Sequence, residues 1–357
     1  MNSRYLPDHI ETPCVVIDVD IVDRNIRRAQ DYLDEHGVMS RPHIKTHKLP
    51  KFAHRQIEAG AIGITCQKIG EAEVMADAGI GDILITYNIV GTAKLQRLRR
   101  LAQTCRLTVV ADSEQVVRGL SETFATAAVE LSVLVECDTG QQRCGVQTSE
   151  QAAHLATFID AAPGLLFDGF MTYPPKKSHE RVNQFLQRAV ELCESNKLEV
   201  NTVSNGGTPD MQNSHLVSCA TEHRSGTYIY NDRSLVESGD CKLADCALAV
   251  HATVVSRPTD DRMIIDAGSK VLTSDPMGLT GFGHVVEYPK AAIRELHEEH
   301  GIVDLSNCVG TLPNIGDIVQ IIPNHACVVS NLFDRVFLRH GDGRIEIQDV
   351  ACRGQVW

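Results

Sequence analysis

A regular alternation of short apolar runs with longer helical patterns, from Cys14 to about Tyr230, constrains the fold more than any other feature of the sequence. Because parallel strands need crossover helices between them, eight such runs predict a parallel sheet, most economically a closed (β/α)8 barrel. An open doubly wound sheet is the alternative, but no GxGxxG follows the first run. The strand runs are 14–18, 42–45, 63–66, 82–87, 107–111, 131–137, 165–171 and 199–205, and the helical patterns include 21–32, 70–78, 151–160 and 180–192.

The rhythm changes after about Asp232, where strand-like runs follow one another with only one helical pattern, over 291–299. Successive strands without long helices indicate an antiparallel sheet. We therefore predict an α/β protein with a barrel over 12–235 and an antiparallel β domain over 236–357 that also takes in residues 1–11. The strand-like runs of the second part are 246–257, 262–266, 317–322, 326–331 and 343–350.

Charge and composition narrow the class of partner. The 357 residues include 34 Lys and Arg against 46 Asp and Glu, a net charge of −12, and no basic block stands out. A small-molecule partner is therefore expected, and nucleic acid is not. No apolar run reaches the roughly 20 residues of a membrane helix, and the first residues lack the apolar core of a signal peptide, which predicts a cytoplasmic protein. The twelve cysteines form no CxxC pair and indicate reduced thiols.

Four segments carry residues suited to chemistry. The first, RPHIKTHK, places Lys45 at the end of the second strand run, where the side chains of a βα barrel form its active site. A lysine amine forms an imine with an aldehyde once desolvation or neighbouring positive charge lowers its pKa, and His43, His47 and Lys48 are such neighbours. The alternative is an ordinary solvated basic loop.

The second and third segments also follow strand runs. In ECDTGQQRCGV, Arg143 reaches the mouth of the predicted barrel, where it donates to a phenolate or carboxylate or simply stays exposed. In VSNGGTPD, Gly206 and Gly207 leave backbone N–H groups free to hold a phosphate, and Thr208 can cap the following turn. A plain tight turn explains these glycines equally well.

The fourth segment, IIPNHACVV, lies in the predicted β domain. In a strand, residues two apart face the same side, so His325 and Cys327 can bind one metal ion together. Taken alone, the pair is weak, because a chain with 15 His and 12 Cys contains such a spacing easily by chance. The interpretation of this pair as a metal site is supported only by its occurrence together with the other three segments.

Together and in this order, the segments resemble the D-threonine aldolase and D-serine dehydratase family, pyridoxal-phosphate enzymes built on the alanine racemase type of barrel. The resemblance covers the chain from about Thr12 to beyond Cys327. RPHIKTHK is similar to the family's cofactor-lysine motif and DTGQQRCGV to its arginine loop. GGT and EHRSGTYIYND are similar to its phosphate-binding segments, and EEHG (298–301) with PNHAC (323–327) to its C-terminal metal region.

The resemblance implies roles for individual residues. Lys45 matches the lysine that holds pyridoxal 5'-phosphate as an imine, Arg143 the arginine beside the cofactor's phenolic oxygen, and Tyr173 the tyrosine near its pyridine nitrogen. His325 and Cys327 match the protein ligands of a divalent metal, which is zinc, manganese or magnesium. The segments that match phosphate contacts supply Gly206, Gly207, Thr208, Gly226 and Thr227.

The resemblance leaves the reaction open. A metal that binds the substrate's β-hydroxyl serves either retro-aldol cleavage or loss of that hydroxyl. His-x-Cys is the pattern of the family's dehydratases and favours zinc over manganese. His179, six residues after Tyr173, stands at the spacing of the aldolases' proton acceptor, or else it only opens the helix over 180–192. We expect retro-aldol cleavage of a β-hydroxy-D-amino acid, of the D-threonine or D-3-hydroxyaspartate type, to glycine and an aldehyde.

Three other interpretations stay open. Dehydration of D-serine or D-3-hydroxyaspartate to a 2-oxo acid and ammonia is the nearest. A racemase leaves the metal pair without a purpose, and a non-catalytic pyridoxal-phosphate carrier does not need the second domain.

The chain also departs from the family pattern. In YPPKK (173–177), where the family commonly has a Tyr-His-Gly-like turn, Lys176 or Lys177 either binds an anionic group of the substrate or merely points to water. In this family the β domain of a second subunit completes the barrel mouth, so the resemblance also implies a homodimer.

Overall fold

The computed structural model describes residues 10–357, which divide into two compact units. One unit, here called the β unit, comprises residues 10–26, Thr46–Leu49 and Thr227–Arg353. The other, the barrel unit, comprises Arg27–Lys45, Pro50–Gly226 and Gly354–Trp357. The domain limits predicted from the sequence stay a prediction, and their residues 1–9 lie outside the described part of the chain.

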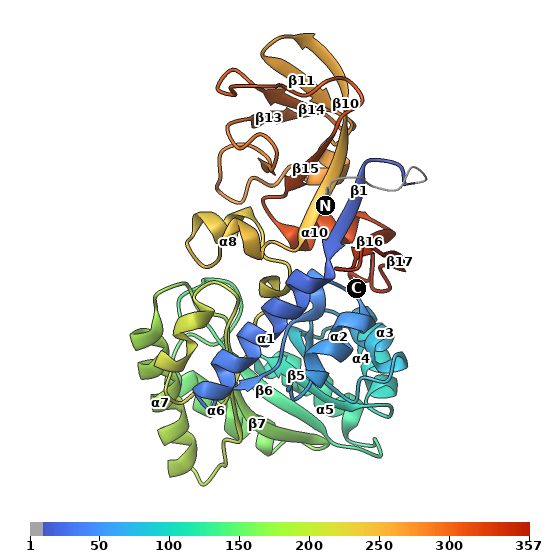
Figure 1. The fold of residues 1–357 in the computed structure, drawn as a ribbon. Helices are drawn as coiled ribbons and strands as arrows, with labels where there is room; N and C mark the ends of the chain where they lie inside the picture. Colours follow the sequence, from blue (N-terminus) through green and yellow to red (C-terminus); the bar gives the residue numbers. More distant parts are fainter. Residues whose placement is uncertain (1–9) are drawn as a thin grey trace. The chain divides into compact units, whose positions relative to one another are not determined.

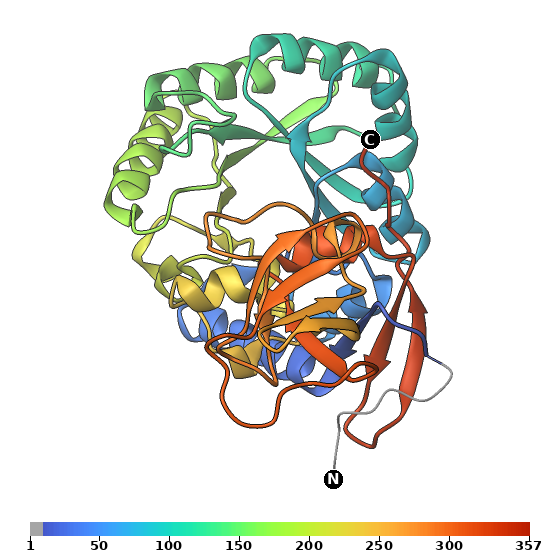
Figure 2. The ribbon, with the colours of Figure 1, turned by 90° about the horizontal axis from the view of Figure 1, so that it is seen from above.

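The barrel unit is built on an eight-stranded parallel sheet in the order β2-β9-β8-β7-β6-β5-β4-β3. The two ends of that order meet, because Thr65 N donates to Pro42 O (2.8 Å) and a bridge joins His43 to Thr65. The predicted (β/α)8 barrel is thus confirmed, with its helices outside the strands (Figure 2). The strands are β2 (Met39–Ser40), β3 (Ile64–Cys66), β4 (Asp82–Asn88), β5 (Arg106–Ala111), β6 (Leu131–Cys137), β7 (Leu165–Thr172), β8 (Thr202–Asn205) and β9 (Glu222–His223).

The barrel helices form where apolar residues recur at helical spacing. In α7 (His179–Ser195), the buried residues Val182, Leu186, Ala189 and Cys193 make one stripe along the helix. Within residues 10–357, no helix is long and apolar enough to cross a membrane. The other helices are α2 (Pro50–Glu58), α3 (Ile69–Asp77), α4 (Thr92–Leu101), α5 (Glu114–Phe124) and α6 (Ser149–Asp160), with short 3-10 turns η1 (Ile44–Thr46) and η2 (Met211–Leu216). Helix α1 (Val19–Glu35) contributes residues to both units.

Two barrel strands differ from the prediction. The run Cys14–Asp18 (β1), expected to begin the barrel, belongs to the β unit, where it pairs with β10 and β16. A fully buried apolar run fits the centre of any sheet, so periodicity alone does not assign it. Its place in the barrel is taken by β9, which the sequence did not predict. The expected strand 42–45 is a bridge at His43 followed by η1.

The β unit is a mostly antiparallel sheet in the order β13-β14-β11-β10-β1-β16-β17, with β15 paired to β10 and β12 (Figure 1). Only β1 and β16 run parallel. The strands beyond β1 are β10 (Leu248–Thr259), β11 (Arg262–Ile265), β12 (His284–Val285), β13 (Ala292–Leu296), β14 (Gly301–Asp304), β15 (Ile318–Ile322), β16 (Arg335–Arg339) and β17 (Ile345–Asp349). Short helices connect them: α8 (Arg233–Glu237), α9 (Ser269–Leu272), α10 (Ala326–Leu332), η3 (Thr227–Ile229) and η4 (Leu243–Asp245).

Two predicted elements of the β unit were wrong. The pattern over 291–299 is strand β13, not a helix, because pairing with β14 outweighs local helix propensity. The run 326–331 is helix α10, not a strand. A short apolar run suits a buried helix and a buried strand equally, so the sequence cannot separate them.

Candidate active site

Lys45 lies on η1, directly after the bridge that closes the barrel. His43 supports this turn, since its Nδ1 accepts from Lys45 N (3.3 Å) and its Nε2 is 3.1 Å from Gln67 Oε1. The Lys45 side chain is half-buried, and no group in residues 10–357 hydrogen-bonds its amine. Lys48, by contrast, is buried and donates its amine to Cys352 O (3.2 Å). Lys45 is therefore the lysine of this motif whose amine is available for chemistry.

The loop after β6 brings Arg143 to Tyr173. Asp138 shapes this loop, because its Oδ1 accepts from Gly140 N (2.8 Å) and Gln142 N (3.1 Å). The exposed Arg143 guanidinium then lies 4.9 Å from the centre of the Tyr173 ring, which follows β7. The structure thus places together two residues that are 30 positions apart in the sequence.

The glycine loop after β8 is packed against two aromatic rings. A Cβ on Gly206, whose φ is +127°, would lie 2.6 Å from His223 Cε1, and one on Gly207 would lie 2.6 Å from Tyr173 Cε2. Burial lowers the pKa of His223 to about 4, so its neutral ring donates from Nε2 to Gly207 O (3.0 Å). A larger residue at either position would therefore force the neighbouring ring to move, and at Gly206 it would also be strained by the positive φ.

Thr208 and Gly226 are also brought together. The Thr208 Oγ1 accepts from Gly226 N at 3.1 Å, which joins the glycine loop to the segment after β9. This donor lies outside the turn that follows Thr208, so a cap by Thr208 on that turn stays a prediction.

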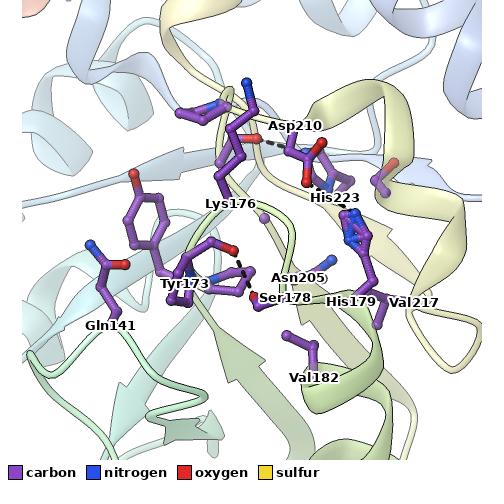
Figure 3. A pocket seen from close by; sticks show the side chains of 16 residues that line it. Gln141, Tyr173, Lys176, Ser178, His179, Val182, Asn205, Asp210, Val217 and His223 are labelled. Atoms are coloured by element: carbon purple, nitrogen blue, oxygen red, sulfur yellow. Dashed lines mark hydrogen bonds and ion pairs between the residues drawn. The ribbon is translucent and has the colours of Figure 1, made fainter. Parts of the chain in front are cut away.

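A cavity of about 210 Å³ adjoins this loop, and its walls come from the ends of β7 and β8 and from α7 (Figure 3). Three buried polar atoms in its wall have no partner among residues 10–357: Asn205 Oδ1, Ser214 Oγ and His223 Nδ1. An unsatisfied buried polar atom costs roughly 1–3 kcal/mol. The cavity is therefore suited to a polar ligand.

His179 is the first residue of α7, as its position before the helical pattern indicated. Its Nε2 is 3.0 Å from Asp210 Oδ2, and the same oxygen accepts from Lys177 N (2.8 Å) (Figure 3). With its Nε2 proton directed at a carboxylate, His179 keeps Nδ1 as the nitrogen that can accept another proton. Sequence reasoning missed Asp210, for which only its place after the glycine motif was a signal.

The candidate metal ligands lie together in the β unit. His325 precedes α10 and Cys327 lies in its first turn, and their side chains hydrogen-bond each other. His325 Nδ1 is 2.9 Å from Asp232 Oδ2. Burial alone lowers the pKa of His325, but Cys327 and Asp232 outweigh burial and raise it to about 10.

The side chains of His325 and Cys327 converge through a helical turn, not through the strand alternation that was expected. Within residues 10–357, no group of three or more His, Cys, Asp or Glu side chains is placed to hold a metal. Of EEHG, residues 298–300 lie in an exposed turn after β13, where Glu299 pairs with Lys270 at 2.5 Å, and Gly301 begins β14. EEHG thus does not join His325 and Cys327 in a larger cluster.

Two further charged residues of the barrel unit were not predicted. Burial lowers the pKa of Arg224 to about 10, and its guanidinium donates to Thr172 O (2.7 Å) and to Ser204 Oγ. Burial also raises the pKa of Glu136 to about 7, against the opposing charge of Arg143. Both residues belong to segments that the sequence singled out, but a single sequence does not show which of their charged residues point inward.

A closed parallel barrel with a strand-end lysine, joined to an antiparallel β unit, defines the alanine racemase class of barrel proteins. Residues 17–234 match the family described as alanine racemase, N-terminal domain, and residues 247–339 match the putative serine dehydratase domain. The chain belongs to the D-threonine aldolase and D-serine dehydratase family, lyases of the alanine racemase fold type.

Several relatives span nearly the whole chain, and two aldolases are among them. D-threonine aldolase of an Arthrobacter species is 33% identical over 97% of this chain and 93% of its own length. The 3-hydroxy-D-aspartate aldolase of Paracoccus denitrificans (strain Pd 1222) is 30% identical over the same shares.

Solved structures of related lyases share the fold of this chain. D-threonine aldolase of Filomicrobium marinum superposes with a TM-score of 0.91 at 32% identity, covering 98% of this chain and 97% of its own. D-threo-3-hydroxyaspartate dehydratase of Delftia sp. HT23 gives 0.87 at 27% identity, covering 98% and 99%. Two mutants of that dehydratase also superpose on this chain. One has a His replaced by Ala, and the other has the Cys two positions later replaced by Ala and is in a metal-free form.

Proposed function

We propose that this protein is a pyridoxal-phosphate- and divalent-metal-dependent lyase that cleaves a β-hydroxy-D-amino acid by retro-aldol reaction to glycine and an aldehyde. The observation that carries the proposal concerns Cys327, whose sulfur lies 3.0 Å from Thr46 Oγ1 and 3.6 Å from Thr227 Oγ1. These threonines directly follow Lys45 and Gly226 in the chain. The metal pair is thus held by the same two segments that carry the candidate cofactor lysine and a candidate phosphate contact.

The barrel unit fits pyridoxal phosphate. Within residues 10–357, no hydrogen bond engages the Lys45 amine, and three buried polar atoms of the adjoining cavity wall have no partner. A Cβ on Gly206 or Gly207 would meet an aromatic ring. When bound, the cofactor withdraws electrons from the substrate's Cα. Lys45 would bind its aldehyde, Arg143 and Tyr173 would orient its ring, and backbone N–H groups of the glycine loop would hold its phosphate.

The β unit fits a divalent metal, because imidazole and thiolate together suit a soft ion such as zinc. When bound, the ion supplies Lewis acidity toward the substrate's β-hydroxyl. His179 is the proposed acceptor of that hydroxyl's proton, through Nδ1, while Asp210 holds the ring by Nε2.

We prefer aldol cleavage to dehydration because His179 is present at the aldolase spacing and because the two aldolases are 33% and 30% identical to this chain, against 27% for the dehydratase structure. Cys327 keeps dehydration as the second candidate. Incubation with D-threonine or D-3-hydroxyaspartate separates the two, since cleavage releases glycine and dehydration releases ammonia. Ammonia without glycine would reverse the order of the two candidates.

The location and assembly belong to the same proposal. We place the protein in the cytoplasm, where its twelve cysteines, none of which forms a disulfide within residues 10–357, remain reduced. We also propose a homodimer, which sedimentation of the purified protein tests directly.

Lys45 provides the direct test of the cofactor. The purified protein should show visible absorption, and borohydride should fix the cofactor on the tryptic peptide that contains Lys45. Lys45→Ala should lose both the absorption and the activity. The matched Lys48→Ala variant, which removes the buried amine bonded to Cys352 O, should keep the absorption. A trapped cofactor on any other lysine would contradict the proposal.

A further inference from the structure

We propose that Asp232 is the positioning residue of the metal site, which presents His325 Nε2 to the ion, and that the hydroxyls of Thr46 and Thr227 hold the sulfur of Cys327 in place. The inference rests on the proposed function only in that His325 and Cys327 bind a divalent metal.

Asp232 is fully buried, and both of its carboxylate oxygens are used. Oδ2 accepts from Ala326 N (3.0 Å) and from His325 Nδ1 (2.9 Å), while Oδ1 accepts from Leu235 N (3.2 Å) and Ser234 Oγ (2.6 Å). An ionised carboxylate can only accept, so the proton on His325 must sit on Nδ1. Nε2 is thereby left as the nitrogen that binds a metal.

The position of Asp232 is itself fixed by a second set of bonds. The backbone after it is tied to the segment before α10, because Arg233 N donates to Pro323 O (3.1 Å) and Ser234 N donates to Asn324 O (3.2 Å). Asn324 is fully buried and donates from Nδ2 to Gly281 O (2.7 Å). The carboxylate is therefore part of a rigid frame, and the His325 ring cannot turn over without breaking its bond to Asp232.

Cys327 is supported separately. Thr46 is fully buried with its Oγ1 3.0 Å from the sulfur, and Thr227 Oγ1 is 3.6 Å away. Once Cys327 binds a metal as a thiolate it has no hydrogen to donate, so both hydroxyls would donate to it. Two such bonds would fix the position of the sulfur and reduce the charge that it passes to the ion.

The first test measures zinc affinity, by competition with a chromophoric chelator, on protein stripped of metal. Asp232→Asn should lower the affinity about 10- to 100-fold. An amide cannot satisfy this site, because its NH2 group must face the N–H of either Ala326 or Leu235. The matched control is Asp245→Asn, a buried carboxylate that instead accepts from Lys242 N (3.0 Å) at the start of η4. The control should keep the affinity of the parent.

The outcomes are separable. If the parent binds zinc and Asp232→Asn binds it within threefold as tightly, the positioning role is wrong and the proposed function stands. If the parent binds no zinc, the metal part of the proposed function fails and this inference fails with it.

A second readout does not depend on the folding of the Asp232 variant. Nitrogen-15 NMR of the zinc-loaded parent should show His325 with hydrogen on Nδ1 and zinc on Nε2, and zinc on Nδ1 would overturn the inference. In the cobalt-loaded protein, Thr46→Val should shift the sulfur-to-cobalt charge-transfer band, and Thr46→Ser, which keeps the hydroxyl, should restore it. An unchanged band in Thr46→Val would remove the role assigned to that hydroxyl.

Discussion

The pair of His179 and Asp210 shows how one contact assigns the two nitrogens of an imidazole. Asp210 Oδ2 binds His179 Nε2 and Lys177 N, while its Oδ1 accepts from Asn213 Nδ2 (2.7 Å). The carboxylate thus holds both the ring and the loop that precedes α7. Its loss affects the orientation of His179 more than the binding of substrate.

Asp210→Asn should therefore lower kcat about 10-fold or more with little change in KM, since a positioned base contributes roughly 10²- to 10⁴-fold. The pH profile of kcat should also shift, because the charge beside the ring is removed. Asn213→Ala, which removes a donor to the other oxygen, serves as control and should keep kcat within threefold. An Asp210→Asn enzyme with unchanged kcat and pH profile would mean that His179 is only the start of α7.

Lys176 and Lys177 are adjacent, but the structure distinguishes them. Lys176 lines the cavity beside the glycine loop (Figure 3), whereas Lys177 is exposed. If Lys176 binds a second carboxylate of the substrate, Lys176→Ala should lower kcat/KM for D-3-hydroxyaspartate about 10- to 100-fold relative to D-threonine, since a charged hydrogen bond contributes roughly 1.5–3 kcal/mol. Lys177→Ala is the matched control. Equal ratios in the two variants would leave Lys176 without this role.

At the scale of single residues, the sequence identified candidate site residues where a residue type or spacing is unusual for its position. Lys45 at a strand end, the paired glycines and the His-x-Cys spacing were all visible. Asp232 and Asp210 were not, because each acts through a partner that folding brings from elsewhere in the chain. A carboxylate in a loop has no signal in the sequence that distinguishes it from a solvated one.

Strand β7 contains Gly169, the glycine at which an added Cβ would come closest to a neighbouring atom. A Cβ on Gly169 would lie 1.8 Å from Thr202 O of β8, and the register between β6 and β7 shifts beside it. A glycine at such a bulge allows the backbones to approach closely.

Gly169→Ala should lower the free energy of unfolding by about 3 kcal/mol or more, because the sheet must open to admit the methyl group. The control is Gly119→Ala in α5, where the new Cβ meets only Leu95 Cδ1 at 3.5 Å. That change should stabilise the protein by about 0.5–1 kcal/mol, since alanine favours a helix. Urea denaturation measures both, and a stable Gly169→Ala protein would contradict the packing described here.

At the scale of elements, the errors in prediction share one cause. The runs 14–18 and 326–331 are both short and largely apolar, yet one is a central strand of the β unit and the other is α10. A run of so few residues does not distinguish the helical period from the strand period. Longer amphipathic segments such as α7 were predicted within a few residues.

Across the whole molecule, two buried histidines couple stability to pH. Burial lowers the pKa of His223 in the barrel unit and of His251 in the β unit from 6.5 to about 4. Between these two pH values the unfolded chain takes up a proton at each site and the folded chain does not. Stability should therefore fall as pH drops from 6.5 to 4, by at most about 3 kcal/mol for each histidine.

Urea midpoints across that range check the effect. His251→Gln should reduce the loss, whereas His54→Gln, at an exposed position, should leave it unchanged. A parent protein that is as stable at pH 4.5 as at pH 7 would show that these rings are not held neutral in the fold.

The sequence by itself determined the class of barrel, the antiparallel second part and the residues able to bind a cofactor and a metal, because alternation, residue type and spacing are local properties. Only the tertiary structure decided that β1 belongs to the β unit, that His325 and Cys327 converge through a helical turn, and that Asp232, Thr46 and Thr227 support them. Those contacts join residues up to 281 positions apart. Such hydrogen bonds form only when folding brings distant segments together. No local pattern in the sequence shows which segments will meet.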